Sequence, residues 1–147
     1  MFDLLINLII ALVLGLILGY ERAQSHKVIG ARSISLILLG AFTFTFISTK
    51  VGGDPSRIIA QVVSGVGFIG AGIVFKDVDS IKNLTTAILV WTISAIGCLI
   101  ALGYRIESIL IATIVYIILK IYPKFKNWYE KSKVLLQRSS IYSTSTC

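Results

Sequence analysis

The sequence has few charged residues, a single histidine and only two cysteines. Charged residues make up 14% of the 147 positions, against about 25% in a typical soluble domain. The lone histidine and the distant cysteines, Cys98 and Cys147, provide none of the His and Cys spacings of a metal or catalytic site. We therefore expect no catalytic residue, no metal and no cofactor, and a protein that is not an enzyme.

Apolar residues are abundant, at 56% of the chain, and the mean hydropathy is +0.89. They form five runs, at residues 4–20, 34–48, 58–75, 84–104 and 106–119. Crossing the hydrocarbon core of a bilayer takes about 20 residues, and somewhat fewer with flanking anchors. The sequence therefore predicts an all-α integral membrane protein, a bundle of five transmembrane helices followed by a short amphipathic C-terminal helix.

Two segments are expected from this pattern. Residues 1–122 form one transmembrane domain, and residues 123–147 form a basic amphipathic cytoplasmic tail, in which aromatic and leucine side chains share one helical face opposite lysines. Too few residues follow the fifth run for a soluble C-terminal domain.

Basic residues are divided unequally between the two sides that five helices define. With the N-terminus outside, only Lys50, Arg57 and Arg105 of the 14 Lys and Arg residues lie on the outer side. Cytoplasmic loops retain Lys and Arg during insertion. We therefore expect a multi-pass protein of the plasma (inner) membrane, with the N-terminus outside and the C-terminus cytoplasmic. The basic inner face predicts contact with anionic membrane lipids, not with nucleic acid.

Polar residues at the ends of the apolar runs are candidates for function, because polar groups near the hydrocarbon core cost free energy. Asp54 before Pro55 predicts a helix start, since Asp caps free N–H groups and Pro fits the first helical position. Arg57 could pair with Asp54, and Gln61 follows one turn later on the same face. For each of these residues, a purely structural role is the alternative to a functional one. For Asp54, capping of the helix is favoured over binding of an ion.

The opposite side carries a second group of candidates. Glu21 with Arg22 or Arg32 predicts either a functional cluster or an ion pair that holds the first two helices together. Asn83 predicts another helix cap. The full set of candidate functional polar residues is Glu21, Arg22, Arg32, Asp54, Arg57, Gln61, Asn83, Thr85 and Thr86.

The stretch "SGVGFIGAG", residues 64–72, has the G-x-G-x-x-G spacing of a dinucleotide site. No strand precedes it, and the next acids come too early for the ribose position, so we interpret its glycines as packing residues. Gly67→Leu is then expected to disturb assembly more than a change at Val66. This interpretation holds equally for packing within one chain and for packing between the copies of a homo-oligomer. The predicted packing residues are Gly15, Gly19, Ser64, Gly65, Gly67, Gly70, Gly72 and Gly97.

Three stretches, "GYERAQSHKVIGARS", "DPSRIIAQVVSGVGFIGAGIVF" and "IKNLTTAILVWTISAIG", resemble the MgtC/SapB family of bacterial inner-membrane proteins in content and order. The chain is similar to a short form without the soluble C-terminal domain of longer members. Ala23 and Ile34 depart from the family's more polar pattern. The matching positions include all nine candidate polar residues and Ser64, Gly65, Gly67, Gly70, Gly72 and Gly97.

The resemblance implies a non-enzymatic regulator of other membrane machinery, including the proton-driven ATP synthase, linked to magnesium limitation and virulence-type stress. The alternative is an oligomeric transporter or channel subunit for an ion or small solute. In that case Asp54, Arg57 and Gln61 would guard one mouth of the path, and Glu21 with Arg32 the other.

Overall fold

The computed structural model describes residues 1–25, 27–52, 54–76 and 81–121. The chain divides into two compact units, Met1–Ile114 and Val115–Cys147. Most of the second unit, including the predicted amphipathic tail helix, lies outside the described residues. The boundary expected at residue 122 stays a prediction.

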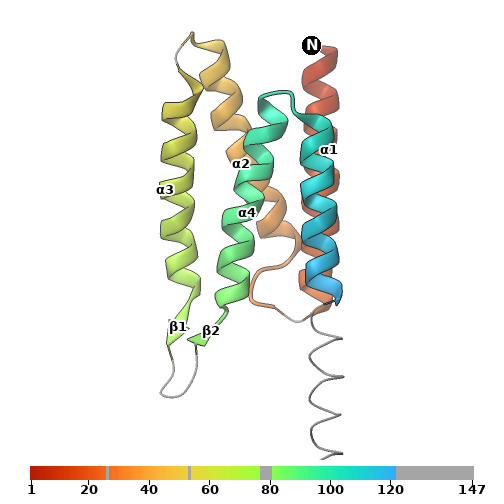
Figure 1. Cartoon of the computed structure of the whole chain (residues 1–147), viewed down its shortest axis with the longest axis vertical. Helices are drawn as coiled ribbons and strands as arrows, with labels where there is room; N and C mark the ends of the chain where they lie inside the picture. Colours follow the sequence, from red (N-terminus) through yellow and green to blue (C-terminus); the bar gives the residue numbers. More distant parts are fainter. Residues whose placement is uncertain (26, 53, 77–80, 122–147) are drawn as a thin grey trace, which may run out of the picture. The chain divides into compact units, whose positions relative to one another are not determined.

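Four long helices and a small hairpin make up most of the first unit (Figure 1). The helices are α1 (Phe2–Gln24), α2 (Ala31–Lys50), α3 (Pro55–Ile73) and α4 (Leu84–Ala101). Between α3 and α4, β1 (Phe75–Lys76) pairs antiparallel with β2 (Ile81–Lys82). A fifth helix begins at residue 105 and is described to residue 121. α1 to α4 are each long and apolar enough to cross a membrane. Together with the fifth helix, they confirm the predicted all-α membrane fold of five helices.

Successive helices run in opposite directions, so two ends of the bundle can be distinguished in Figure 1. The N-terminal end holds the start of α1, the α2–α3 turn and the turn after α4. The hairpin end holds the last turn of α1, the start of α2 and the β1–β2 pair. The candidate residues predicted on opposite sides of the membrane accordingly lie at opposite ends, with Asp54 at the N-terminal end and Glu21 at the hairpin end.

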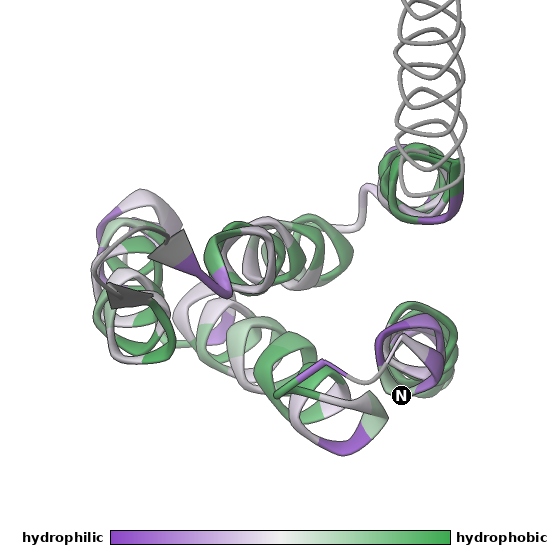
Figure 2. Cartoon of the chain, turned by 90° about the horizontal axis from the view of Figure 1, so that it is seen from below, coloured by the Kyte–Doolittle hydropathy of each residue, from purple (hydrophilic) through white to green (hydrophobic). Residues whose placement is uncertain are grey.

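The core lies around α2 and α4, which are flanked by α1 on one side and α3 on the other (Figure 2). Half of the α4 span is buried, against 17% of the α3 span. α4 is apolar all round, as expected for a central helix. Its Ile93 and Ile96 pack in the same core as Leu38 and Phe42 of α2, and all four are essentially inaccessible. Of α1 to α4, α3 therefore has the most open surface.

Glycines on α1 and α4 allow close approach to α2. A Cβ added at Gly15 would stand 2.8 Å from the Cα of Ser35, and one at Gly19 would overlap the backbone of Ala31. A Cβ at Gly97 would meet the carbonyl oxygen of Leu38. Small residues at such crossings let backbones pack closely without a hydrophobic driving force between helices.

Most helix ends lie two to four residues from the ends of the apolar runs, and two of these differences change the reading of nearby residues. α1 continues past Tyr20 to Gln24, so Glu21 and Arg22 belong to the helix and not to the following loop. α4 ends at Ala101, three residues earlier than expected. Gly103, with φ of 91°, donates to the Ile100 carbonyl, and Tyr104 donates to that of Leu99. This left-handed glycine cap closes the helix and turns the chain into the fifth helix.

Candidate functional site

Asp54 is the N-cap of α3, as predicted. Its Oδ1 accepts a hydrogen bond from the Ser56 backbone N–H at 2.9 Å, and its Oδ2 accepts one from the Ser56 hydroxyl at 2.6 Å. These bonds favour the ionised carboxylate, the side-chain bond most strongly, and hold the pKa of Asp54 below its usual range. Pro55 occupies the first helical position, where its missing N–H costs nothing. Asp54 is thus an exposed, charged cap at the N-terminal end.

Arg57 and Gln61 follow Asp54 along α3 but do not pair with it. Both side chains are exposed, and neither makes a hydrogen bond or ion pair with any described residue. The Arg57–Asp54 pair that the spacing suggested is therefore absent, and the carboxylate accepts its hydrogen bonds from Ser56. All three residues line an open pocket of about 510 Å³ beside the end of α2. This Asp54 cluster, defined as Asp54, Arg57 and Gln61, leaves a cation and an amide free for an external group.

Replacing Asp54 separates its capping role from its charge. Asn caps a helix about as well as Asp, whereas Ala does not. At pH 7, Asp54→Asn is expected to lose function and only the small stability that the charge adds to the cap, and Asp54→Ala to lose function and melt at a clearly lower temperature. Thermal melts and growth complementation of a deletion strain in low magnesium measure the two effects. Full complementation by Asp54→Asn would reduce Asp54 to a cap.

The same carboxylate makes stability depend on pH in acid. Because its pKa is lowered by folding, its contribution is complete above the pKa of the unfolded chain and is lost as the pH falls through the lower, folded value. The Asp54→Asn protein should lack this part of the acid destabilisation.

Glu21 and Arg22 form an ion pair at the hairpin end of α1. The Arg22 Nε lies 3.1 Å from the Glu21 Oε2, and their side chains are 5% and 11% exposed. The direction of this contact is not that of a hydrogen bond, so both atoms are buried without a hydrogen-bond partner. Ser25 donates its hydroxyl to the other Glu21 oxygen at 3.0 Å. Arg32 is exposed and has no partner in the described parts of the chain, so Arg22 is the residue that pairs with Glu21.

Asn83 stands at the N-cap of α4 but does not cap with its side chain. Its φ is 64°, a left-handed conformation that Asn tolerates better than most residues. Its Nδ2 lies 3.4 Å from the carbonyl oxygen of Ile73, the last residue of α3, in a long hydrogen bond. Asn83 therefore links the start of α4 to the end of α3. In the first turn that follows, Thr85 is exposed and Thr86 is buried.

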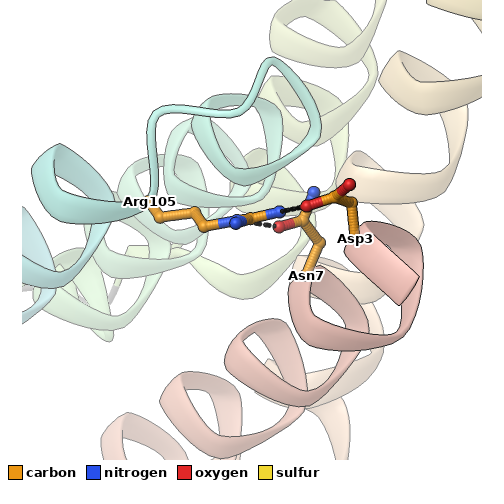
Figure 3. A network of polar contacts seen from close by, with 3 residues as sticks. All are labelled: Asp3, Asn7 and Arg105. Atoms are coloured by element: carbon orange, nitrogen blue, oxygen red, sulfur yellow. Dashed lines mark hydrogen bonds and ion pairs between the residues drawn. The ribbon is translucent and has the colours of Figure 1, made fainter. Parts of the chain in front are cut away.

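A third polar cluster, not predicted from the sequence, joins α1 to the fifth helix (Figure 3). Arg105 donates from Nε to Asn7 Oδ1 at 2.6 Å and from an Nη to Asp3 Oδ1 at 2.8 Å. The four-residue spacing of Asp3 and Asn7 puts both on one face of α1. This shared face is the only feature of the local sequence that points to the network. The network ties together residues about 100 positions apart and provides a donor for the amide oxygen of the buried Asn7.

The small residues of α3 have a different environment from the glycines of α1 and α4. Around Gly65, Gly67 and Gly72, no atom lies within 4 Å of the place of a Cβ, and Ser64 is exposed. Gly70 makes an ordinary contact with Ala87 of α4. Val66 is buried, so within one chain a change there should cost more than Gly67→Leu, the reverse of the sequence-based expectation. That Ser64, Gly65, Gly67 and Gly72 pack against a helix of another molecule stays a prediction.

No group of three or more His, Cys, Asp or Glu side chains within the described ranges could hold a metal ion. The candidate features are instead charged side chains at both ends of an apolar bundle and the exposed face of α3.

The profile of the MgtC family matches residues 8–128. Protein MgtC of Salmonella typhimurium (strain LT2) is 37% identical over 116 residues, which are 78% of this chain and 50% of that protein. Protein MgtC of Brucella abortus (strain 2308) is 43% identical over 88 residues, 58% of this chain and 37% of that protein. The chain thus spans half or less of the length of these relatives. No solved structure matches significantly. On the extent of the profile match, this membrane protein belongs to the MgtC family.

Proposed function

We propose that this protein is a non-enzymatic regulator that contacts other proteins in the bacterial inner membrane, in the response to magnesium limitation or virulence-type stress. The observation that carries the proposal is an exposed row of small residues on α3. Ala60, Ser64, Gly67 and Ala71 follow at spacings of four, three and four, so they share one helical face, and all are exposed. A second helix can approach such a face closely in lipid. We call these four residues the small-residue face.

Membership of the MgtC family supports the link to magnesium and stress. Family resemblance alone makes the proton-driven ATP synthase a candidate partner. Membrane lipids and a second copy of the chain are further candidates.

The interior of the described bundle favours regulation over transport by a single chain. Between the charged ends, the buried side chains are mainly apolar, including Leu18, Ile34 and Leu38. Arg22, at one end, is the only charged residue buried among the described residues. A transport path would therefore have to form between copies. Purified protein in liposomes should show no ion flux above protein-free vesicles, and a flux that depends on Asp54 or Arg57 would favour the transporter.

The small-residue face can be blocked without disturbing the chain's own packing. Gly67→Leu adds a side chain to open space, so the purified protein should keep its melting temperature while losing complementation in low magnesium, at least tenfold in growth yield. Gly72→Leu is the matched control, because Gly72 is equally open but lies off this face. Complementation by Gly67→Leu at the level of Gly72→Leu would contradict partner contact through this face.

We also propose that the N-terminal end of the bundle faces outward and the hairpin end the cytoplasm, on the distribution of Lys and Arg. A reporter active only in the cytoplasm should be bright when fused at Cys147, and a periplasm-active reporter should be silent. The opposite pattern would refute this orientation.

A further inference from the structure

A continuous groove runs along the membrane face between α2 and α3. Its apolar part encloses about 550 Å³ and is lined from α2 by residues between Leu36 and Phe44 and from α3 by residues between Ile58 and Ile69. The mouth of about 510 Å³, which holds the Asp54 cluster, shares Phe44, Ile58 and Gln61 with it. One groove therefore joins an apolar trunk to a polar mouth.

The groove is open because each of its two walls has a glycine where a larger side chain would fill the space. Gly40 of α2 and Gly65 of α3 both line the apolar part, and no atom lies within 4 Å of where a Cβ would stand on either. α2 and α3 also contact each other much less than either contacts α4. The space is therefore available to an outside molecule.

The length of the trunk matches one leaflet of a bilayer. From Ile58 to Ile69 the helix rises about 17 Å, at 1.5 Å per residue. Half of a hydrocarbon core about 30 Å thick is about 15 Å. An acyl chain entering at the mouth would follow the trunk over the depth that lipid chains of that leaflet occupy.

The mouth presents groups that complement a zwitterionic headgroup. The Arg57 guanidinium has no partner in the described chain and is suited to a phosphate. The Asp54 carboxylate stays ionised while it caps α3 and can attract an ammonium group. Gln61 lies one turn deeper than Arg57, about 6 Å along the helix, where its free amide can donate to an ester carbonyl.

From this arrangement we propose that the α2–α3 groove binds one phosphatidylethanolamine molecule, with an acyl chain in the trunk, its phosphate on Arg57 and its ammonium near Asp54. The site depends on neither the proposed regulatory role nor the orientation of the protein, because it requires only the leaflet at the N-terminal end.

A helix of a second copy is a poorer occupant. It would leave Arg57 and Asp54 without complementary groups.

The test counts lipids on the purified full chain by native mass spectrometry, after incubation with an equimolar mixture of phosphatidylethanolamine and phosphatidylglycerol. The parent should retain one phosphatidylethanolamine. Gly65→Leu and Gly40→Leu, which fill the trunk from opposite walls, should each lower its occupancy at least tenfold. Gly72→Leu, outside the groove, should bind as the parent does, and equal melting temperatures of the variants would establish that the fold is intact.

Changes at the mouth test the headgroup assignment. Arg57→Gln should weaken binding of both lipids about tenfold, since a hydrogen bond to a charged group is lost. Asp54→Asn keeps the cap but should abolish the preference for phosphatidylethanolamine. The proposal is overturned if both trunk variants keep the parent's lipid count, or if the parent binds the two lipids equally. It is also overturned if Gly65→Leu dissociates a dimer while leaving bound lipid unchanged.

Discussion

Gly19→Leu is expected to prevent α1 from packing on α2 and to cause the largest loss of folded protein of any glycine substitution in α1 or α3. Even a Cβ at this position overlaps the backbone of Ala31, which cannot move aside as a flexible side chain could. Overpacking of this kind costs about 1–3 kcal/mol, and sometimes more. The neighbouring crossing at Gly15 is also tight, against Ser35, so the two helices cannot simply shift along each other.

Thermal melts of the detergent-solubilised protein measure this effect. Gly67→Leu is the matched control, because the same substitution there meets open space, and Gly19→Ala should give an intermediate loss. A Gly19→Leu protein with the melting temperature of the parent would show that α1 and α2 do not meet at this crossing.

Arg22→Met is expected to destabilise the bundle by about 3–5 kcal/mol, the cost of leaving one partner of a buried ion pair uncompensated. The substitution keeps an unbranched apolar stem but removes the guanidinium beside Glu21. The remaining carboxylate would then have only the Ser25 hydroxyl as a partner in the described chain. Because the pair in the parent is buried without good hydrogen-bond geometry, removing both charges should cost much less than removing one.

The free energy of unfolding in mixed micelles provides the measurement. The double variant Glu21→Gln, Arg22→Met should recover most of the loss. Arg32→Met is the control, since Arg32 is exposed and a surface change away from special features stays within about 0.5 kcal/mol. Equal destabilisation by Arg22→Met and Arg32→Met would contradict the buried pair.

Features that depend on neighbouring residues could be predicted from the sequence. The positions of the five helices follow from long apolar runs, because a chain in lipid must satisfy its backbone hydrogen bonds within each segment. The start of α3 follows from Asp54 and Pro55, whose cap involves only the next two residues. The Gly15 and Gly19 spacing likewise indicated a close helix approach before any partner helix was known.

Features that join distant residues were decided only by the tertiary structure. The sequence did not determine that Arg22, and not Arg32, pairs with Glu21, nor that Arg105 reaches Asp3 and Asn7. It also did not separate the tightly packed Gly19 from the open Gly65, since both lie in apolar helices. Within a bilayer, apolar side chains gain little by leaving lipid for one another, so helix pairing depends on the fit of two surfaces. That fit is a property of two helices together, and neither sequence segment contains it alone.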